Sequence, residues 1–177
     1  MKPGRYKSVR SMRPIERAHG RVALATEGTE VFKTIDLTLE GQAAYILAVK
    51  FDWLIVGALA DANDDIYDIK GLLTMDEDFN PADLDSNFSA YMDSEQVITN
   101  FSHNFQNVIT TSGQTVLPGK SEMQIMPAEG ILVPESVRLA GVIGDGGSTA
   151  SVLECSIWYK RIENPTAEMK DYFYRRR

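Results

Sequence analysis

The segment VFKTIDLTLEGQAAYILAVKFDWLIVGAL, residues 31–59, contains two stretches in which apolar and polar side chains alternate. Alternation with a period of two residues is the pattern of a strand with one buried face. The first stretch, residues 31–39, predicts a strand, and Gly41-Gln42 predicts the turn that follows it. The second stretch, residues 43–59, predicts a long strand, because its aromatic and β-branched content favours a strand over a helix.

One face of this long strand is predicted to enter the core. Its members are every second residue, namely Tyr45, Leu47, Val49, Phe51, Trp53 and Ile55. Lys50 and Asp52 fall on the opposite face. That face is therefore expected to be partly exposed to solvent.

Further strand patterns, separated by turn residues, follow along the chain after a first strand that starts near Val22. The predicted strands cover residues 66–74, 96–110, 122–126, 136–143 and 150–162. The run from Gly144 to Gly147, between the last two, predicts a β-hairpin. About eight strands with little helix predict an all-β domain, in the form of a sandwich, a barrel or a jelly roll.

Residues 75–94 are polar and acidic and contain Pro81, so they predict a long loop with a single helical turn. A chain of 177 residues is long enough to bury one core and suits a single domain. It has no apolar run long enough to cross a bilayer as a helix, so no membrane partner is expected. Its one cysteine, Cys155, lies mid-strand and is predicted to be a small buried hydrophobe.

Charge is distributed unevenly along the chain, whose formal net charge is −7. Residues 1–21 carry seven basic side chains and one acidic side chain, and residues 160–177 carry six basic and three acidic ones. Residues 22–159 carry five basic and 21 acidic side chains. A basic terminal segment on an acidic body is typical of proteins whose arms meet nucleic acid or an acidic partner surface.

Residues 1–21 are predicted to form a flexible basic arm, because they lack apolar periodicity and contain Pro3 and Pro14. Residues 22–163 are predicted to form the β-domain, and residues 164–177 an aromatic and basic tail. Cations spread along a flexible backbone suit the neutralisation of phosphates. The predicted nucleic-acid contacts are Lys2, Arg5, Lys7, Arg10, Arg13, Arg17, Arg21, Arg175, Arg176 and Arg177. Docking of the arm on the acidic body of a neighbouring subunit is the alternative.

An acidic cluster begins at Asp61 and imitates the start of an EF-hand calcium loop. The pattern fails at Ile66, where the EF-hand has glycine, and at Leu72, where it has glutamate. The carboxylates could still bind calcium weakly, and the candidate metal ligands are Asp61, Asp64, Asp65 and Asp68. A solvated acidic loop is the alternative, and no other cofactor is expected.

The sequence contains only two histidines, His19 and His103, and it shows no nucleophile-elbow motif. His103 falls on a predicted strand face beside Phe101, where a core or interface residue is expected. The glycines after Ile143 lack the Gly-Lys-Ser/Thr sequence of a phosphate-binding loop. An enzyme is therefore not expected.

The layout resembles the small single-jelly-roll capsid proteins of icosahedral viruses. The resemblance is carried by the basic arm from Lys2 to Arg21, the run of strands from Val22 to Ile162, and the ending WYKRI of the last strand. It implies an antiparallel jelly-roll β-sandwich of about eight strands. It also implies a virion coat protein that self-assembles into a closed shell of about 60 identical subunits, with the arm facing the viral nucleic acid inside.

The alternative function is that of a β-sandwich binding module, such as a virion attachment or carbohydrate-binding protein. Exposed aromatic rings would stack on sugars in such a module, and the candidates are Tyr67, Tyr91 and Trp53. An enzyme of the cupin kind fits less well. Cupins hold a metal with clustered histidines, whereas His19 and His103 lie far apart in the sequence.

Overall fold

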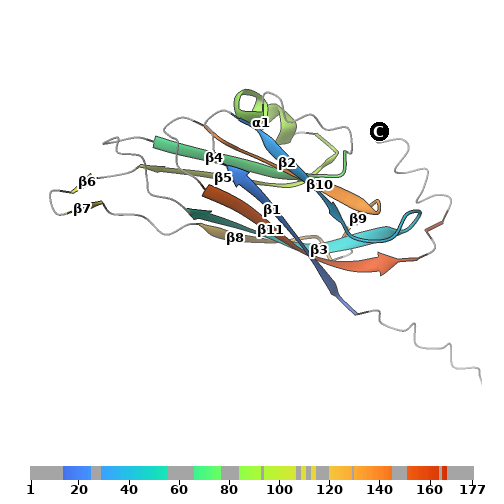
Figure 1. Ribbon diagram of the computed structural model, residues 1–177. Helices are drawn as coiled ribbons and strands as arrows, with labels where there is room; N and C mark the ends of the chain where they lie inside the picture. Colours follow the sequence, from blue (N-terminus) through green and yellow to red (C-terminus); the bar gives the residue numbers. More distant parts are fainter. Residues whose placement is uncertain are drawn as a thin grey trace, which may run out of the picture.

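The computed structural model contains two antiparallel β-sheets that pack face to face (Figure 1). The residues that it describes are 14–24, 29–55, 66–76, 84–92, 94–106, 109–110, 113–114, 120–128, 130–144, 151–163 and 165–166. Across these residues the chain is mostly strand, which confirms the predicted all-β class. Within the same residues, no helix is long and apolar enough to cross a membrane.

Each sheet is built from strands that lie far apart in the sequence. The first sheet contains, in spatial order, β1 (Glu16–Leu24), β11 (Ser151–Ile162), β3 (Ala43–Ile55) and β8 (Ser121–Ile125), and β9 (Ile131–Val133) also pairs with β3. The second sheet contains β2 (Val31–Asp36), β10 (Ser136–Ile143), β4 (Ile66–Thr74) and β5 (Val97–Gln106). A separate pair is formed by β6 (Ile109–Thr110) and β7 (Gly113–Gln114). The strands predicted over residues 66–74 and 136–143 coincide with β4 and β10.

The strands pair from the two ends of the chain inward. β1 pairs with β11, β2 with β10, β3 with both β8 and β9, and β4 with β5. Pairing of β10 with β4 and of β11 with β3 completes the two sheets, and every pairing is antiparallel. Each sheet therefore alternates strands from the N-terminal half and the C-terminal half of the chain.

The core lies between the sheets and is filled by the inward side chains of both. Phe51 of β3 meets Phe101 of β5 with the ring centroids 5.7 Å apart, so this pair joins one sheet to the other. Gly71 of β4 lies where the sheets approach closely, because a Cβ at this position would overlap the Cδ2 methyl of Leu153 on β11 and force that side chain to shift. Cys155 is buried in this core, as predicted.

A β-bulge in the middle of β3 changes which of its side chains enter the core. β11 pairs Trp158 with Ala48 but pairs the next residue, Tyr159, with Ile46. Leu47 is therefore the extra residue of the bulge. The alternation of inward and outward side chains along β3 changes phase at this point.

Burial along β3 follows the change of phase. Beyond the bulge the predicted residues Val49, Phe51 and Trp53 are buried, and Ala48, which follows the bulge directly, is buried as well. Before the bulge, Ala44 and Ile46 are buried, whereas Tyr45 and Leu47 are only partly buried. The predicted core face is wrong for Tyr45 and Leu47, because an uninterrupted period of two residues cannot represent an inserted residue.

Replacement of Ile46 by alanine is expected to lower the free energy of unfolding by about 2–5 kcal/mol, the range for deleting a fully buried branched side chain. Leu47→Ala removes a side chain that is already partly exposed, so its cost is expected to be clearly smaller. Urea denaturation of the two variants measures both costs. A larger cost for Leu47→Ala would show that β3 has no bulge at this position.

The strands on either side of the glycine run after Ile143 do not pair with each other as the predicted hairpin requires. β10 lies in the second sheet between β2 and β4, and β11 lies in the first sheet between β1 and β3. Both edges of each strand are already paired, so β10 and β11 cannot pair with each other. The connection passes from one sheet to the other, and its residues 145–150 lie outside the described residues.

The helix α1 (Leu84–Met92) covers the outer face of the second sheet (Figure 1). Leu84 and Phe88, one helical turn apart, are buried against Leu72 of β4 and against Ala140 and Val142 of β10. The prediction of a single helical turn is wrong in extent, because the helix runs for nine residues. Among its described side chains only Leu84 and Phe88 are buried, so the apolar stripe is too narrow to stand out in the sequence.

Candidate nucleic-acid interface

β1 directs its basic side chains outward from the first sheet. The strand begins at Glu16, so residues 16–21 pair with β11, and the prediction that they belong to a flexible arm is wrong. The strand alternation places Arg17, His19 and Arg21 on the outer face, where all three are exposed. The basic part of the chain that precedes β1 therefore leads directly onto an outward row of basic residues.

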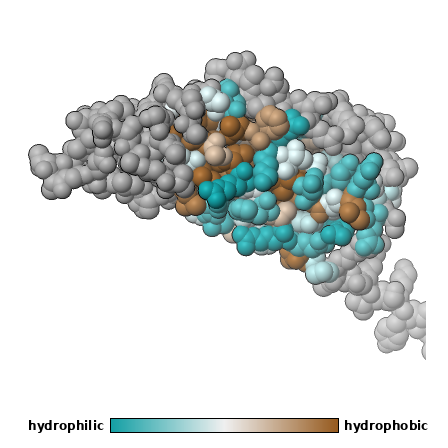
Figure 2. All heavy atoms as spheres, viewed as in Figure 1, coloured by the Kyte–Doolittle hydropathy of each residue, from teal (hydrophilic) through white to brown (hydrophobic). Residues whose placement is uncertain are grey.

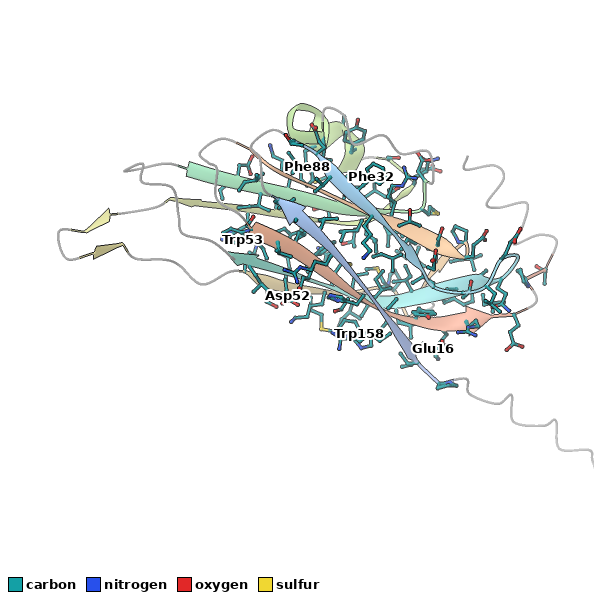
Figure 3. All side chains as sticks on the ribbon, in the orientation of Figure 1. Glu16, Phe32, Asp52, Trp53, Phe88 and Trp158 are labelled. Carbon is teal, nitrogen blue, oxygen red and sulfur yellow. The ribbon has the colours of Figure 1, made fainter. Side chains whose placement is uncertain are left out.

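Arg17 is held on the outer face by two residues of β11. Its Nη2 donates a hydrogen bond to Ser156 Oγ at 2.8 Å, and its guanidinium carbon lies 5.2 Å from the ring centroid of Trp158. A guanidinium over an indole ring is a favourable cation–π contact. His19 Nδ1 lies 3.4 Å from the same Ser156 hydroxyl oxygen. The guanidinium of Arg17 thus covers one face of the Trp158 ring, and Trp158 is labelled in Figure 3.

Ion pairs balance the charge at the centre of this outer face. Arg21 Nε lies 3.7 Å from Glu154 Oε1, and Lys50 Nζ lies 2.7 Å from Asp52 Oδ1. Burial alone would raise the pKa of Asp52. Hydrogen bonds from Lys50 and Ser121, with the charges of Lys50 and Arg17, outweigh burial and lower that pKa. The face therefore combines cations, anions and an aromatic ring, and it is not uniformly basic.

Most of the predicted nucleic-acid contacts lie outside the described residues. They are Lys2, Arg5, Lys7, Arg10, Arg13, Arg175, Arg176 and Arg177. Their contact with nucleic acid stays a prediction. The structure brings Arg17 and Arg21 onto one face with Lys50, and no local sequence pattern groups Lys50 with them.

Asp68 is the one candidate metal ligand within the described residues, and it faces a cation of its own chain. Its Oδ2 lies 2.7 Å from Lys70 Nζ. Asp61, Asp64 and Asp65 lie outside the described residues. Within the described part of the chain, no group of three His, Cys, Asp or Glu side chains could hold a metal ion. Calcium binding by the acidic cluster stays a prediction.

Two of the aromatic residues considered for sugar stacking pack against other residues of the domain. Trp53 is 1% exposed, so its assignment as an exposed stacking ring is wrong. Trp53, which is labelled in Figure 3, belongs to the core face of β3. Tyr91 packs against the cluster between α1 and the second sheet. The side chain of Tyr67 lies outside the described residues.

His103 lies half-buried on β5, with its ring centroid 5.8 Å from that of Trp53. Burial and then the positive charge of Lys120 lower the pKa of His103 below its ordinary value. A core or interface histidine was predicted, and the half-buried ring of His103 beside the buried Trp53 agrees with that prediction. The imidazole of His103 therefore binds a proton more readily in the unfolded chain than in the folded chain.

Stability is therefore expected to fall as the pH drops through about 6.5 toward the lowered folded pKa of His103, because protons then favour the unfolded state. His103→Asn removes the titrating group, so it should weaken the loss of melting temperature between about pH 7.5 and pH 5.5. Thermal unfolding of both proteins across this range measures the difference. An identical pH dependence in the variant would show that His103 is not responsible.

Exposed apolar side chains on the first sheet were missed by the sequence reasoning. Met123 and Ile125 of β8 are 56% and 81% exposed, and Leu54 of β3 is 44% exposed. The surface seen in Figure 2 likewise mixes hydrophobic with hydrophilic residues. The alternation in Ser121–Ile125 predicts a strand, but alternation does not say which face of that strand is buried.

No protein-family model matches this chain, and no curated protein matches it either. Neither comparison assigns a family, a partner or a reaction.

Proposed function

We propose that this chain is a structural coat subunit with a jelly-roll fold, which self-assembles into the icosahedral shell of a virion. The observation that carries the proposal is the nested strand pairing, β1 with β11, β2 with β10, β3 with β8 and β9, and β4 with β5. Two Greek keys folded over each other give sheets in which early and late strands alternate, as both sheets here do. This order supports a jelly roll over the other all-β sandwiches.

Fold alone does not select a coat protein, because lectin domains and cupins use the jelly roll too. The charge distribution supports the coat subunit. Five basic residues lie before β1, within residues 1–13, and Arg17 and Arg21 continue them along the strand. In the proposed shell, this basic region faces the interior and neutralises the phosphates of the enclosed nucleic acid.

The contacts of the aromatic residues disfavour the rival carbohydrate-binding module. Trp53 is buried, and Trp158 is covered on one side by the Arg17 guanidinium. Sugar rings stack on flat, accessible aromatic faces. On the outer face of the first sheet, the described residues include no tryptophan with both ring faces uncovered. The role of Trp158 on this face is to position a cation.

Light scattering on the purified protein tests the proposal. A coat subunit should give one high-mass species, many times the monomer mass, with a narrow size distribution. A protein that stays monomeric at high concentration, at both low and high salt, would contradict the proposed shell. Binding of that monomer to immobilised glycans would support the binding module instead.

A further inference from the structure

The two sheets of the sandwich have four edge strands, and three of these edges are protected. β1 and β2 contact each other at one side of the sandwich. Two of the four exposed side chains of β1, those of Arg17 and Arg21, are charged, and charges on an edge strand discourage pairing with another strand. At the opposite side lie β5 and β8.

Side chains of the neighbouring sheet protect the free edge of β5. Gln124 Nε2 donates a hydrogen bond to the carbonyl oxygen of Asn100 at 2.9 Å. Lys120 Nζ donates one to the carbonyl oxygen of Ser102 at 3.3 Å. Both donors come from β8 or the residue before it, so the first sheet closes the edge of the second.

The free edge of β8 has no such protection among the described residues. Trp53 N donates to Lys120 O at 2.8 Å, and Met126 N donates to Leu47 O at 2.9 Å. Antiparallel pairs exchange hydrogen bonds at every second residue, so the even-numbered residues of β8 bond to β3. The N–H and C=O groups of Ser121, Met123 and Ile125 therefore point away from β3.

The same three residues also carry exposed side chains. Met123 is 56% exposed and Ile125 is 81% exposed, and Ser121 is exposed beside them. The strand contains no proline, and no lysine lies within Ser121–Ile125. An edge whose backbone groups have no partner among the described residues, and whose side chains include apolar ones, is a template for another strand.

We propose that β8 pairs antiparallel with β8 of a second copy of this chain, about a two-fold axis at Met123. In this register Met123 lies opposite the partner subunit's Met123, and Ser121 lies opposite the partner subunit's Ile125. The apolar side chains then cover one another on the outer face, and the first sheet continues from one subunit into the next. A two-fold axis makes the contact closed, because each copy offers the same strand.

The charge pattern of β8 suits pairing with a copy of the same strand. Glu122 falls opposite the partner subunit's Gln124 and not opposite another glutamate, so no like charges face each other across the axis. Within one chain, Glu122 is already neutralised by Lys120, whose Nζ lies 3.0 Å from Glu122 Oε2. Hydrogen bonds from Gln124 and Lys120 lower the pKa of Glu122, so the carboxylate stays ionised and paired.

Pairing of five residues buries less than the roughly 1,200 Å² of a stable independent interface. The dimer is therefore expected to be weak and concentration-dependent. Its existence does not require the proposed shell, so the dimer and the shell can each fail without the other. Within a shell, the same contact would relate two-fold neighbours.

A disulfide tests the register directly. In Met123→Cys the two new thiols should face each other in a hydrogen-bonded pair, with Cα atoms about 5.5 Å apart, which suits a disulfide. Cys155 does not compete, because it is buried and burial raises the pKa of its thiol far above the usual value. Leu39→Cys is the matched control, because Leu39 is apolar and 69% exposed but lies in the turn after β2.

Under mild oxidation, Met123→Cys is expected to form covalent dimers at least about tenfold faster than Leu39→Cys, because pairing raises the effective thiol concentration. Equal rates would overturn the proposal. The two rates of disulfide formation can be compared in dissociated protein and in assembled particles. The test of the β8 contact therefore does not depend on whether the protein forms shells.

Charge exchange tests the identity of the occupant. Met123→Lys and Met123→Glu should each lose self-association, because like charges would face each other across the axis. A mixture of the two variants should recover it, and analytical ultracentrifugation measures both results. Recovery requires β8 of one variant to pair with β8 of the other. Self-association of either variant by itself, or a mixture that stays monomeric, would overturn the proposal. Circular dichroism checks that both variants are folded.

Discussion

Phe51→Ala is expected to lower the free energy of unfolding by about 3–5 kcal/mol, the range for removing a buried aromatic ring. Phe51 is fully buried, and its ring packs against Phe101 of the opposite sheet. The substitution leaves a cavity at the contact between the two sheets and removes the favourable ring pair. Urea denaturation monitored by circular dichroism measures the cost.

Leu54→Ala, on the same strand, is the matched control for Phe51→Ala. Leu54 is 44% exposed on the outer face of the first sheet, so its loss should change stability by about 0.5 kcal/mol or less. Similar costs for the two variants would mean that β3 does not have one buried face and one exposed face. The packing of β3 between the two sheets would then be incorrect.

Deletion of residues 1–13 is expected to weaken binding to single-stranded nucleic acid strongly at low salt. The segment contains Lys2, Arg5, Lys7, Arg10 and Arg13. Each phosphate that a cation neutralises in a single strand contributes about 0.7 to the slope of log affinity against log salt, so five contacts contribute about 3.5. From about 50 to 200 mM salt, the full chain should lose about a hundredfold more affinity than the deleted chain.

The deletion ends at residue 13 because β1 begins at Glu16 and pairs along its whole length with β11. Removing residues 1–21 would delete most of β1, an edge strand of the first sheet. A loss of nucleic-acid binding could then result from unfolding of the domain. A full-length variant with the five cations replaced by glutamine is the control, and it should match the deletion. If the salt slopes of the full, deleted and substituted chains agree, the segment does not contact nucleic acid, and docking on a neighbouring subunit explains it better.

The existence of most strands could be predicted from the sequence, because long alternation and turn residues are local signals. β4 and β10 begin and end at the predicted residues. Gly41 has a φ of 77°, which lies in the left-handed region that glycine favours, and it occupies the predicted turn. These features depend only on residues close together in the chain.

The arrangement of the strands could not be predicted, because it depends on pairings between distant residues. The glycine run after Ile143 predicts a hairpin locally, yet β10 and β11 each find two other partners. The bulge at Leu47 is equally invisible, since it arises from the register between β3 and β11. Local alternation specifies a strand but not its neighbours.

The candidate interface shows the same limit. The basic composition of the N-terminal region predicts Arg17 and Arg21 as contacts, but no local pattern indicates that Arg17 lies over Trp158. Arg17 and its hydrogen-bond partner Ser156 are 139 positions apart. Charge is visible in composition, whereas the surface that presents it forms only when β1 pairs with β11.

Electron microscopy of the purified full-length chain tests the proposed coat function most directly. We expect closed, round particles of uniform diameter, because identical subunits with a fixed set of contacts assemble with point-group symmetry. Averaged images should show icosahedral symmetry. A field that contains only small, separate molecules at high protein concentration and across salt conditions would contradict the proposal that this chain builds a shell.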